Sequence, residues 1–131
     1  MSERKPTKVT ELEGVVMDCV WDMTEVTVRD VHLRLQPTRP MAYNTVLTVM
    51  RILRDKGLLT SRREGRRDVY RPVVSRADVG RSSLDELLNL FFEGSPAALV
   101  SHLLDTRALH AEQVRAIRAE VDRAMQELED E

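Results

Sequence analysis

The sequence predicts a mainly α-helical protein with one small β-hairpin, followed by a purely helical C-terminal region. Two observations lead to this prediction. Along most of the 131 residues, apolar side chains recur at spacings of three and four, which is typical of amphipathic helices. This period is interrupted once, between residues 58 and 73, where two short segments flank the turn Glu64-Gly65-Arg66 and are expected to be strands. The length suits one domain with at most a short addition.

The first half of the chain is expected to form three short helices. Thr10 with Glu13, and Thr27 with Asp30, have the spacing of a capping box, in which two side chains satisfy the free amides of a new helix. The first helix would bury a stripe formed by Val9, Leu12, Val16, Cys19, Val20 and Met23. A third helix is expected at about residues 42–56. Its buried face would consist of Val46, Leu47, Met50 and Leu53.

The C-terminal part of the chain predicts three further helices. Ser75 and Ser95 stand at capping positions, and Gly94 separates the first two helices. The apolar residues exceed what three short helices can bury among themselves, so we expect a second copy of the chain to cover the remainder. The predicted dimer interface consists of Leu87, Leu88, Phe91, Leu99, Leu103, Val114, Ile117 and Val121. The chain is therefore divided into residues 1–74 and a dimerisation region, residues 75–131.

Charge is distributed unevenly between these two parts. The formal net charge is −2, but residues up to Pro72 carry 14 Lys and Arg against 10 Asp and Glu, whereas the remainder carries 6 against 12. The basic excess is concentrated between Arg51 and Arg71, with eight basic and three acidic residues. Such a basic segment favours an anionic partner.

Three helices followed by a basic hairpin is the order of a winged helix-turn-helix domain, which binds DNA. The third helix of such a domain lies in the major groove, and the hairpin, or wing, contacts the DNA backbone. The outward face of helix 42–56 would offer Asn44 and Arg51 to base edges, and the wing, residues 62–67, would neutralise phosphates. The residues expected at DNA are Arg39, Tyr43, Asn44, Thr45, Thr48, Arg51, Arg62, Arg63, Arg66 and Arg67.

Several stretches also carry a specific string of motifs. They include Arg-Pro-Met-Ala-Tyr-Asn-Thr-Val-Leu-Thr-Val-Met at residues 39–50, Lys-Gly-Leu-Leu at residues 56–59, and the Phe-x-Gly-Ser-Pro-x-x-Leu-Val run at residues 92–100. This string resembles the penicillinase-repressor family of BlaI/MecI type over nearly the whole chain. The resemblance implies a homodimeric repressor that binds an inverted-repeat operator in double-stranded DNA and blocks transcription.

The resemblance also bears on regulation. It implies a membrane-bound sensor protease as a partner, because members of the β-lactam circuit are inactivated by cleavage of an Asn-Phe bond in the dimerisation helix. At the matching place this chain has His102-Leu103, which is the candidate cleavage site and departs from the family sequence. Copper-responsive relatives carry a C-terminal Cys-x-Cys cluster. The tail here, residues 126–131, has no cysteine, which excludes copper sensing of that kind.

The remaining residue types argue against other chemistry. Cys19 falls within an apolar stripe and is expected to be buried rather than redox-active. His32, His102 and His110 lack carboxylates at ligand spacing, so neither a metal site nor a cofactor is expected. The chain has no Gly-rich phosphate loop and no nucleophile motif, so it is not expected to be an enzyme.

One alternative function stays open at this level. The chain could be a protein-interaction module with a winged-helix scaffold and no sequence-specific DNA binding, whose leucine-rich helices bind a different protein. No apolar run approaches the roughly 20 residues of a transmembrane helix, and residues 1–8 lack the apolar core of a signal peptide. Membrane insertion is therefore not expected, and a cytoplasmic location is.

Overall fold

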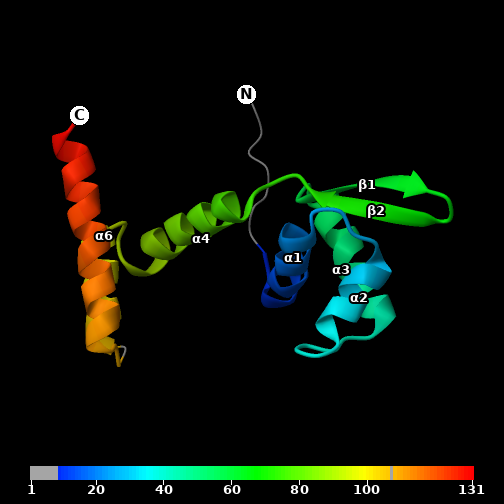
Figure 1. The fold of residues 1–131 in the computed structure, drawn as a ribbon, viewed down its shortest axis with the longest axis horizontal. Coiled ribbons are helices and arrows are strands. Elements are labelled where there is room, and N and C mark those ends of the chain that lie inside the picture. The colour runs from blue at the N-terminus through cyan, green and yellow to red at the C-terminus, as the bar shows by residue number, and fades with distance from the viewer. Residues whose placement is uncertain (1–8, 107) are drawn as a thin grey trace. The chain divides into compact units, whose positions relative to one another are not determined.

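The computed structural model describes residues 9–106 and 108–131, so the expectations for residues 1–8 lie outside the described part (Figure 1). The elements, in order, are α1 (Glu11–Met23), α2 (Val28–Leu35), α3 (Tyr43–Asp55), β1 (Leu59–Glu64), β2 (Arg67–Pro72), α4 (Arg76–Phe91), α5 (Pro96–Thr106) and α6 (Ala111–Glu129). The predicted class, mainly helical with one hairpin, is confirmed. By proximity the chain divides into two compact units, Met1–Glu86 and Leu87–Glu131. The functional boundary at residues 74 and 75 stays a prediction.

Both predicted capping boxes form. The hydroxyl of Thr10 accepts a hydrogen bond from the amide of Glu13 at 3.2 Å, and the Thr10 amide donates to the Glu13 carboxylate at 3.0 Å. Thr27 and Asp30 make the same reciprocal pair at 3.1 and 2.9 Å. These bonds satisfy amides that would otherwise be free, and they fix the first residues of α1 and α2.

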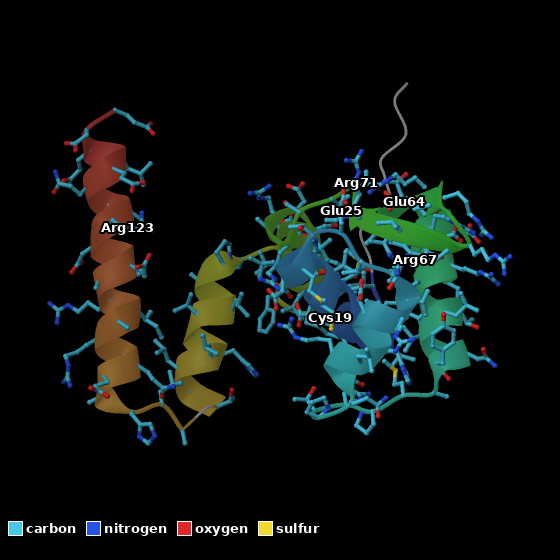
Figure 2. All side chains as sticks on the ribbon, turned by 45° about the vertical axis from the view of Figure 1, so that its right-hand side comes forward. Cys19, Glu25, Glu64, Arg67, Arg71 and Arg123 are labelled. Atoms are coloured by element: carbon cyan, nitrogen blue, oxygen red, sulfur yellow. The ribbon has the colours of Figure 1, made fainter. Side chains whose placement is uncertain are left out.

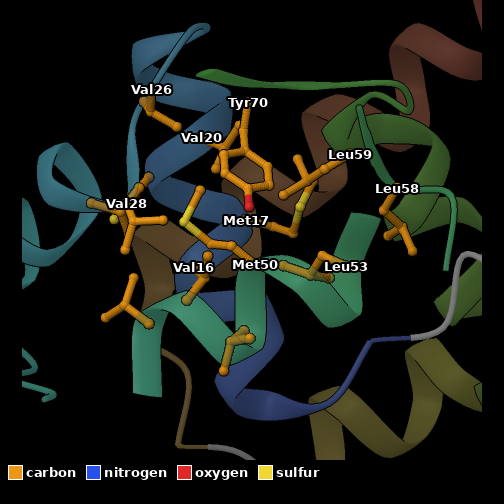
Figure 3. Packing of buried hydrophobic residues seen from close by; sticks show 14 of the residues in the cluster. Val16, Met17, Val20, Val26, Val28, Met50, Leu53, Leu58, Leu59 and Tyr70 are labelled. Carbon is orange, nitrogen blue, oxygen red and sulfur yellow. The ribbon is translucent and has the colours of Figure 1, made fainter. Parts of the chain in front are cut away.

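One apolar cluster holds α1, α2, α3 and the hairpin together (Figure 3). On α3 the predicted inward face is confirmed for Val46, Met50 and Leu53, each fully buried, while Leu47 packs against the cluster and is partly exposed. Cys19 is buried, as predicted, and burial raises the pKa of its thiol. The core of this first unit therefore leaves the opposite face of α3 exposed.

The hairpin is a regular antiparallel pair that opposes Glu64 to Arg67 at its end. Gly65 and Arg66 alone form the turn, which is one residue narrower than the predicted Glu-Gly-Arg turn. Gly65 has a φ of 63°, a backbone conformation that glycine adopts without steric cost and that two-residue hairpin turns require. Arg66 is therefore placed at the tip of the wing.

Tyr70 carries a hydroxyl that is buried in the core. Figure 3 shows the ring pointing into the cluster beside Met17, Val20 and Met50, and within the described residues its hydroxyl has no hydrogen-bond partner. Because a buried hydroxyl without a partner is unfavourable, Tyr70→Phe should leave the free energy of unfolding unchanged or raise it by about 1 kcal/mol. Urea denaturation measures the change. The exposed Tyr43→Phe serves as the control, and a loss above ~1 kcal/mol for Tyr70→Phe would contradict the prediction.

The helices α5 and α6 of the second unit begin at residues that make capping hydrogen bonds. The Ser95 hydroxyl accepts from the amide of Ala98 at 3.1 Å, and Gly94 adopts a φ of 74° between α4 and α5. The His110 amide donates to the Gln113 side chain at 2.8 Å as α6 begins. Within the described chain, no residue of α5 or α6 is buried. Among all helices of the described residues, none alone is long and apolar enough to cross a membrane, although α4 and α5 reach that length and composition together as a bent pair.

Candidate nucleic-acid interface

The outward face of α3 carries the polar side chains predicted to meet base edges. Asn44, Thr45, Thr48 and Arg51 are all exposed, and Tyr43 is 46% exposed at the start of the helix. Their exposure follows from the burial of the opposite face, because residues three and four apart share one side of a helix. The predicted recognition helix, about residues 42–56, agrees with α3 to within one residue at each end.

A groove of about 420 Å³ lies between α3 and the hairpin. The lining residues are Tyr43, Leu47 and Arg51 of α3, Arg63, Arg66, Arg67 and Asp68 of the hairpin, and Thr27, Val28 and Arg29 at the start of α2. Five of these residues are arginines and one is an aspartate, so the groove carries a large excess of positive charge. The fold thus brings part of the predicted helix set and part of the predicted wing set to one concave surface, which we call the arginine groove.

Arg29 lines the arginine groove although it was not among the residues predicted to contact DNA. It lies in the first turn of α2, two residues after the capping residue Thr27. Its spacing in the sequence does not distinguish it from any other arginine on an exposed helix face. Its place in the groove depends on the packing of α2 against α3, which a sequence pattern does not show.

Arg62 belongs to a different environment from the other wing arginines. Its guanidinium donates to both carboxylate oxygens of Glu25, at 3.0 and 3.1 Å, and its Nε donates to Glu64 at 2.8 Å. The hydrogen bond to Glu25, with that to Glu64, raises the pKa of Arg62, and the same bond holds the pKa of Glu25 below its ordinary value. Glu25 and Glu64 lie on the hairpin side of the unit in Figure 2. Two carboxylates therefore oppose the single charge of Arg62.

The arginines at positions 39, 63, 66 and 67, also predicted to contact DNA, make weaker ion pairs or none among the described residues. Arg63 makes one long contact to Asp68, 3.4 Å, and Arg39, in the loop before α3, lies 3.8 Å from Glu11. Within the described residues, Arg66 and Arg67 have no ion-pair partner inside 4 Å. Alternate residues of a strand point to opposite faces, which explains why Arg62 and Arg63 differ although they are neighbours in the sequence.

A partly buried ion pair holds α3 against α1. Lys56, which caps the C-terminal end of α3, donates to both carboxylate oxygens of Glu13 at 2.8 and 3.0 Å, and the Glu13 side chain is only 8% exposed. Burial acts to raise the pKa of Glu13, but the bonds from Lys56 and Thr10 outweigh it, so this pKa lies below its ordinary value. Glu13 therefore caps one helix and anchors another.

The residues predicted for the dimer interface lie on α4, α5 and α6, and their apolar side chains are largely exposed to solvent in the single chain. Leu87, Phe91, Leu103, Val114 and Val121 are between 38% and 72% exposed. Leu88, Leu99 and Ile117 are partly buried. Such exposure of large apolar side chains at helical spacing is typical of a surface that a partner covers.

The candidate cleavage pair and the histidines have no metal-binding arrangement. His102 and Leu103 are exposed on α5, and the His102 ring packs against Phe92 with ring centroids 5.4 Å apart. Among residues 9–106 and 108–131, no group of three His, Cys, Asp or Glu side chains could hold a metal ion. The arginine groove, with five arginines and one aspartate in its lining, is suited to binding an anion.

Comparisons with known proteins agree with this geometry. The family model described as penicillinase repressor matches residues 9–123. The transcriptional regulator BlaI of Mycobacterium tuberculosis is 37% identical over 127 residues, which cover 95% of this chain and 88% of that protein. The penicillinase repressor of Bacillus licheniformis is 25% identical over 87% of this chain and 89% of its own length. The solution structure of the DNA-binding domain of the repressor BlaI matches with a TM-score of 0.51 and 27% identity, over 59% of this chain and 93% of that domain.

Proposed function

The chain belongs to the penicillinase repressor family, and we propose that it represses transcription as a homodimer on an inverted-repeat operator in double-stranded DNA. It is a sequence-specific DNA-binding transcriptional repressor and not an enzyme. Three further features are proposed for this chain: which residues read the operator, that two copies form a dimer, and how the dimer is released from DNA. We also propose a cytoplasmic location, where such a repressor would meet chromosomal DNA.

The arginine groove is the observation that carries the proposed mode of DNA binding. The major groove of B-DNA admits an α-helix, so α3 can enter it with Asn44 and Arg51 directed at base edges. Arg66 and Arg67 of the wing, and Arg29 of α2, would then reach the phosphates beside the major groove. Base contacts from α3 would supply specificity, and the wing would supply affinity that does not depend on sequence.

The proposed dimer is supported by the open apolar faces of α4, α5 and α6. A second copy related by two-fold symmetry would cover the same side chains on both chains. It would also present two α3 helices to successive half-sites, which lie roughly 34 to 36 Å apart or at a multiple of that distance. The inverted repeat of the operator would then mirror the symmetry of the protein.

Release from the operator is proposed to occur by cleavage between His102 and Leu103 by a membrane-bound sensor protease. The bond lies inside α5, where the Thr106 hydroxyl donates to the carbonyl of His102 at 2.7 Å, so local opening of the helix must precede cutting. Mass spectrometry of the protein recovered from induced cells tests this step. An intact chain after induction would contradict it.

Selection of genomic DNA fragments by the purified protein at near-physiological salt tests the proposed operator. Sequencing of the retained fragments should reveal one enriched inverted repeat, and the genes beside it would indicate the regulated pathway. Retention of fragments without a shared motif would instead favour the protein-interaction module. A partner search would then replace the DNA experiments.

Asn44→Ala is expected to relax specificity at one base position. A bidentate contact from Asn to adenine discriminates against other bases by ~1 to 3 kcal/mol, and truncation of the side chain removes it. Competition between operators that differ at single positions measures this loss. Gln126→Ala, which truncates an exposed amide on α6 outside the residues expected at DNA, is the control. An equal loss of affinity for every sequence would show that Asn44 does not read a base.

Arg66→Ala and Arg62→Ala are expected to differ although both remove a wing arginine. Arg66 has no ion-pair partner inside 4 Å among the residues that the structure describes, so its loss should weaken binding to all sequences and reduce the slope of log affinity against log salt by ~1. Arg62 is occupied by Glu25 and Glu64, so its loss should leave that slope nearly unchanged. Equal changes in slope for the two variants would contradict the separate environments of these arginines.

A further inference from the structure

The segment that leaves the hairpin is built into the core of the DNA-binding unit. Val74 and Val79 are 9% and 5% exposed and belong to the same apolar cluster as α1 and α3. The indole Nε1 of Trp21, on α1, donates to the carbonyl of Val74 at 2.9 Å. These contacts join a residue of the first helix to one that lies 53 positions further along the chain. The start of α4 is therefore fixed on α1.

Arg76 adds a charged contact to this junction. Its Nη2 lies 3.3 Å from carboxylate oxygens of both Asp18 and Asp22, and its guanidinium carbon lies 5.3 Å from the centre of the Trp21 ring. Each such contact is weak at an exposed site. Two carboxylates and one aromatic face together, however, define a single position for the planar guanidinium. All of these residues belong to the unit that ends at Glu86.

We propose that this α1–α4 clamp, formed by Asp18, Trp21, Asp22, Val74, Arg76 and Val79, sets the separation of the operator half-sites that the dimer accepts. The inference rests on the proposed dimeric function. The clamp is mounted on α1, which also packs against the recognition helix α3. α4 runs without a break to Phe91, and so passes from the DNA-binding unit into the residues of the proposed dimer interface. The clamp thus controls the direction in which α4 leaves the DNA-binding unit.

The geometry of DNA makes this direction measurable. Each base pair inserted between two half-sites moves one of them by about 3.4 Å and rotates it by roughly 35° about the duplex axis. If α4 starts in a fixed direction on both chains, the dimer can place its two α3 helices on half-sites at only one spacing. Once the clamp is loosened, the start of α4 can adapt, and several spacings become acceptable. The residues of the clamp are thus positioning residues, because none of them needs to touch DNA.

The test compares full-length variants on a series of operators. The probes are the inverted repeat recovered from genomic selection, the same repeat with its spacer shortened by one or lengthened by one or two base pairs, and a single half-site. Arg76→Ala and Trp21→Phe loosen the clamp, and circular dichroism and sedimentation check that both variants fold and dimerise. Arg81→Ala is the matched control, because Arg81 lies on the same helix and its ion pair, at 3.5 Å, is to Asp78 of α4 itself.

Wild-type protein and Arg81→Ala should bind one spacing best. In Arg76→Ala and Trp21→Phe the ratio of the affinity for that spacing to the affinity for neighbouring spacings should fall by about tenfold. Affinity for the single half-site should stay unchanged. Variants that keep the wild-type preference would overturn the role of the clamp and leave the proposed function intact. A wild-type protein that binds the half-site and every spacing equally well would overturn both the clamp and the dimeric operator.

Discussion

Leu103→Asp is expected to convert the protein to monomers and to lower its affinity for the full operator by roughly 10²- to 10⁴-fold, which is the gain that linking two binding events supplies. Leu103 is 38% exposed on α5 in the single chain and lies in the proposed dimer interface. A carboxylate placed there would lose its water without gaining a partner when two copies associate. Sedimentation velocity gives the mass, and fluorescence anisotropy gives the affinity.

The control for this prediction separates dimerisation from DNA contact. Ser101→Asp introduces the same charge on α5 at an exposed polar position outside the proposed interface, and should leave both mass and affinity unchanged. Affinity for a single half-site should be the same in wild type and Leu103→Asp, because α3 and the wing are untouched. A dimeric Leu103→Asp with full operator affinity would remove Leu103 from the interface.

The parts of the fold that could be predicted are those that depend on neighbours in the sequence. The capping pairs at Thr10 and Thr27 act within one helical turn, and the hairpin depends on the turn at Gly65. Met17 shows where this reasoning ends, because it is fully buried although it falls outside the predicted stripe of α1. The structure packs α1 against both α3 and β2, so a wider face is covered than one stripe provides. That packing is a tertiary property which periodicity does not carry.

The same holds for the candidate site: features within one helix could be predicted, and contacts between distant segments could not. The outward residues of α3 could be predicted because burial of one face of a helix determines the other. The separation of Arg62 from Arg66 could not, since it depends on Glu25, which comes from the segment between α1 and α2. The position of Arg29 in the arginine groove likewise depends on how α2 packs. In both cases the missing information is a contact between segments that are distant in the sequence.

The ion pair between Glu13 and Lys56 is of the same long-range kind, and its loss should have the largest effect on stability. Glu13→Gln keeps a side-chain oxygen that can cap the amide of Thr10, but it removes the charge that Lys56 requires. The Lys56 side chain is 34% exposed and can partly regain water. We therefore expect the free energy of unfolding to fall by about 2 kcal/mol, below the cost of breaking a fully buried pair. Urea denaturation at neutral pH measures the change.

The pH dependence of this loss distinguishes an ion pair from simple packing. Because the pKa of Glu13 in the folded state lies below its ordinary value of 4.5, the stabilisation is complete above pH 4.5 and is lost as the pH falls through the folded-state pKa. The difference between wild type and Glu13→Gln should therefore shrink when denaturation is repeated between neutral pH and about pH 3. Glu11→Gln, two residues away and with an 85% exposed side chain, should change the free energy of unfolding by less than about 0.5 kcal/mol. A difference for Glu13→Gln that stays constant with pH would mean that the charge of Glu13 contributes nothing and that the loss arises from shape alone.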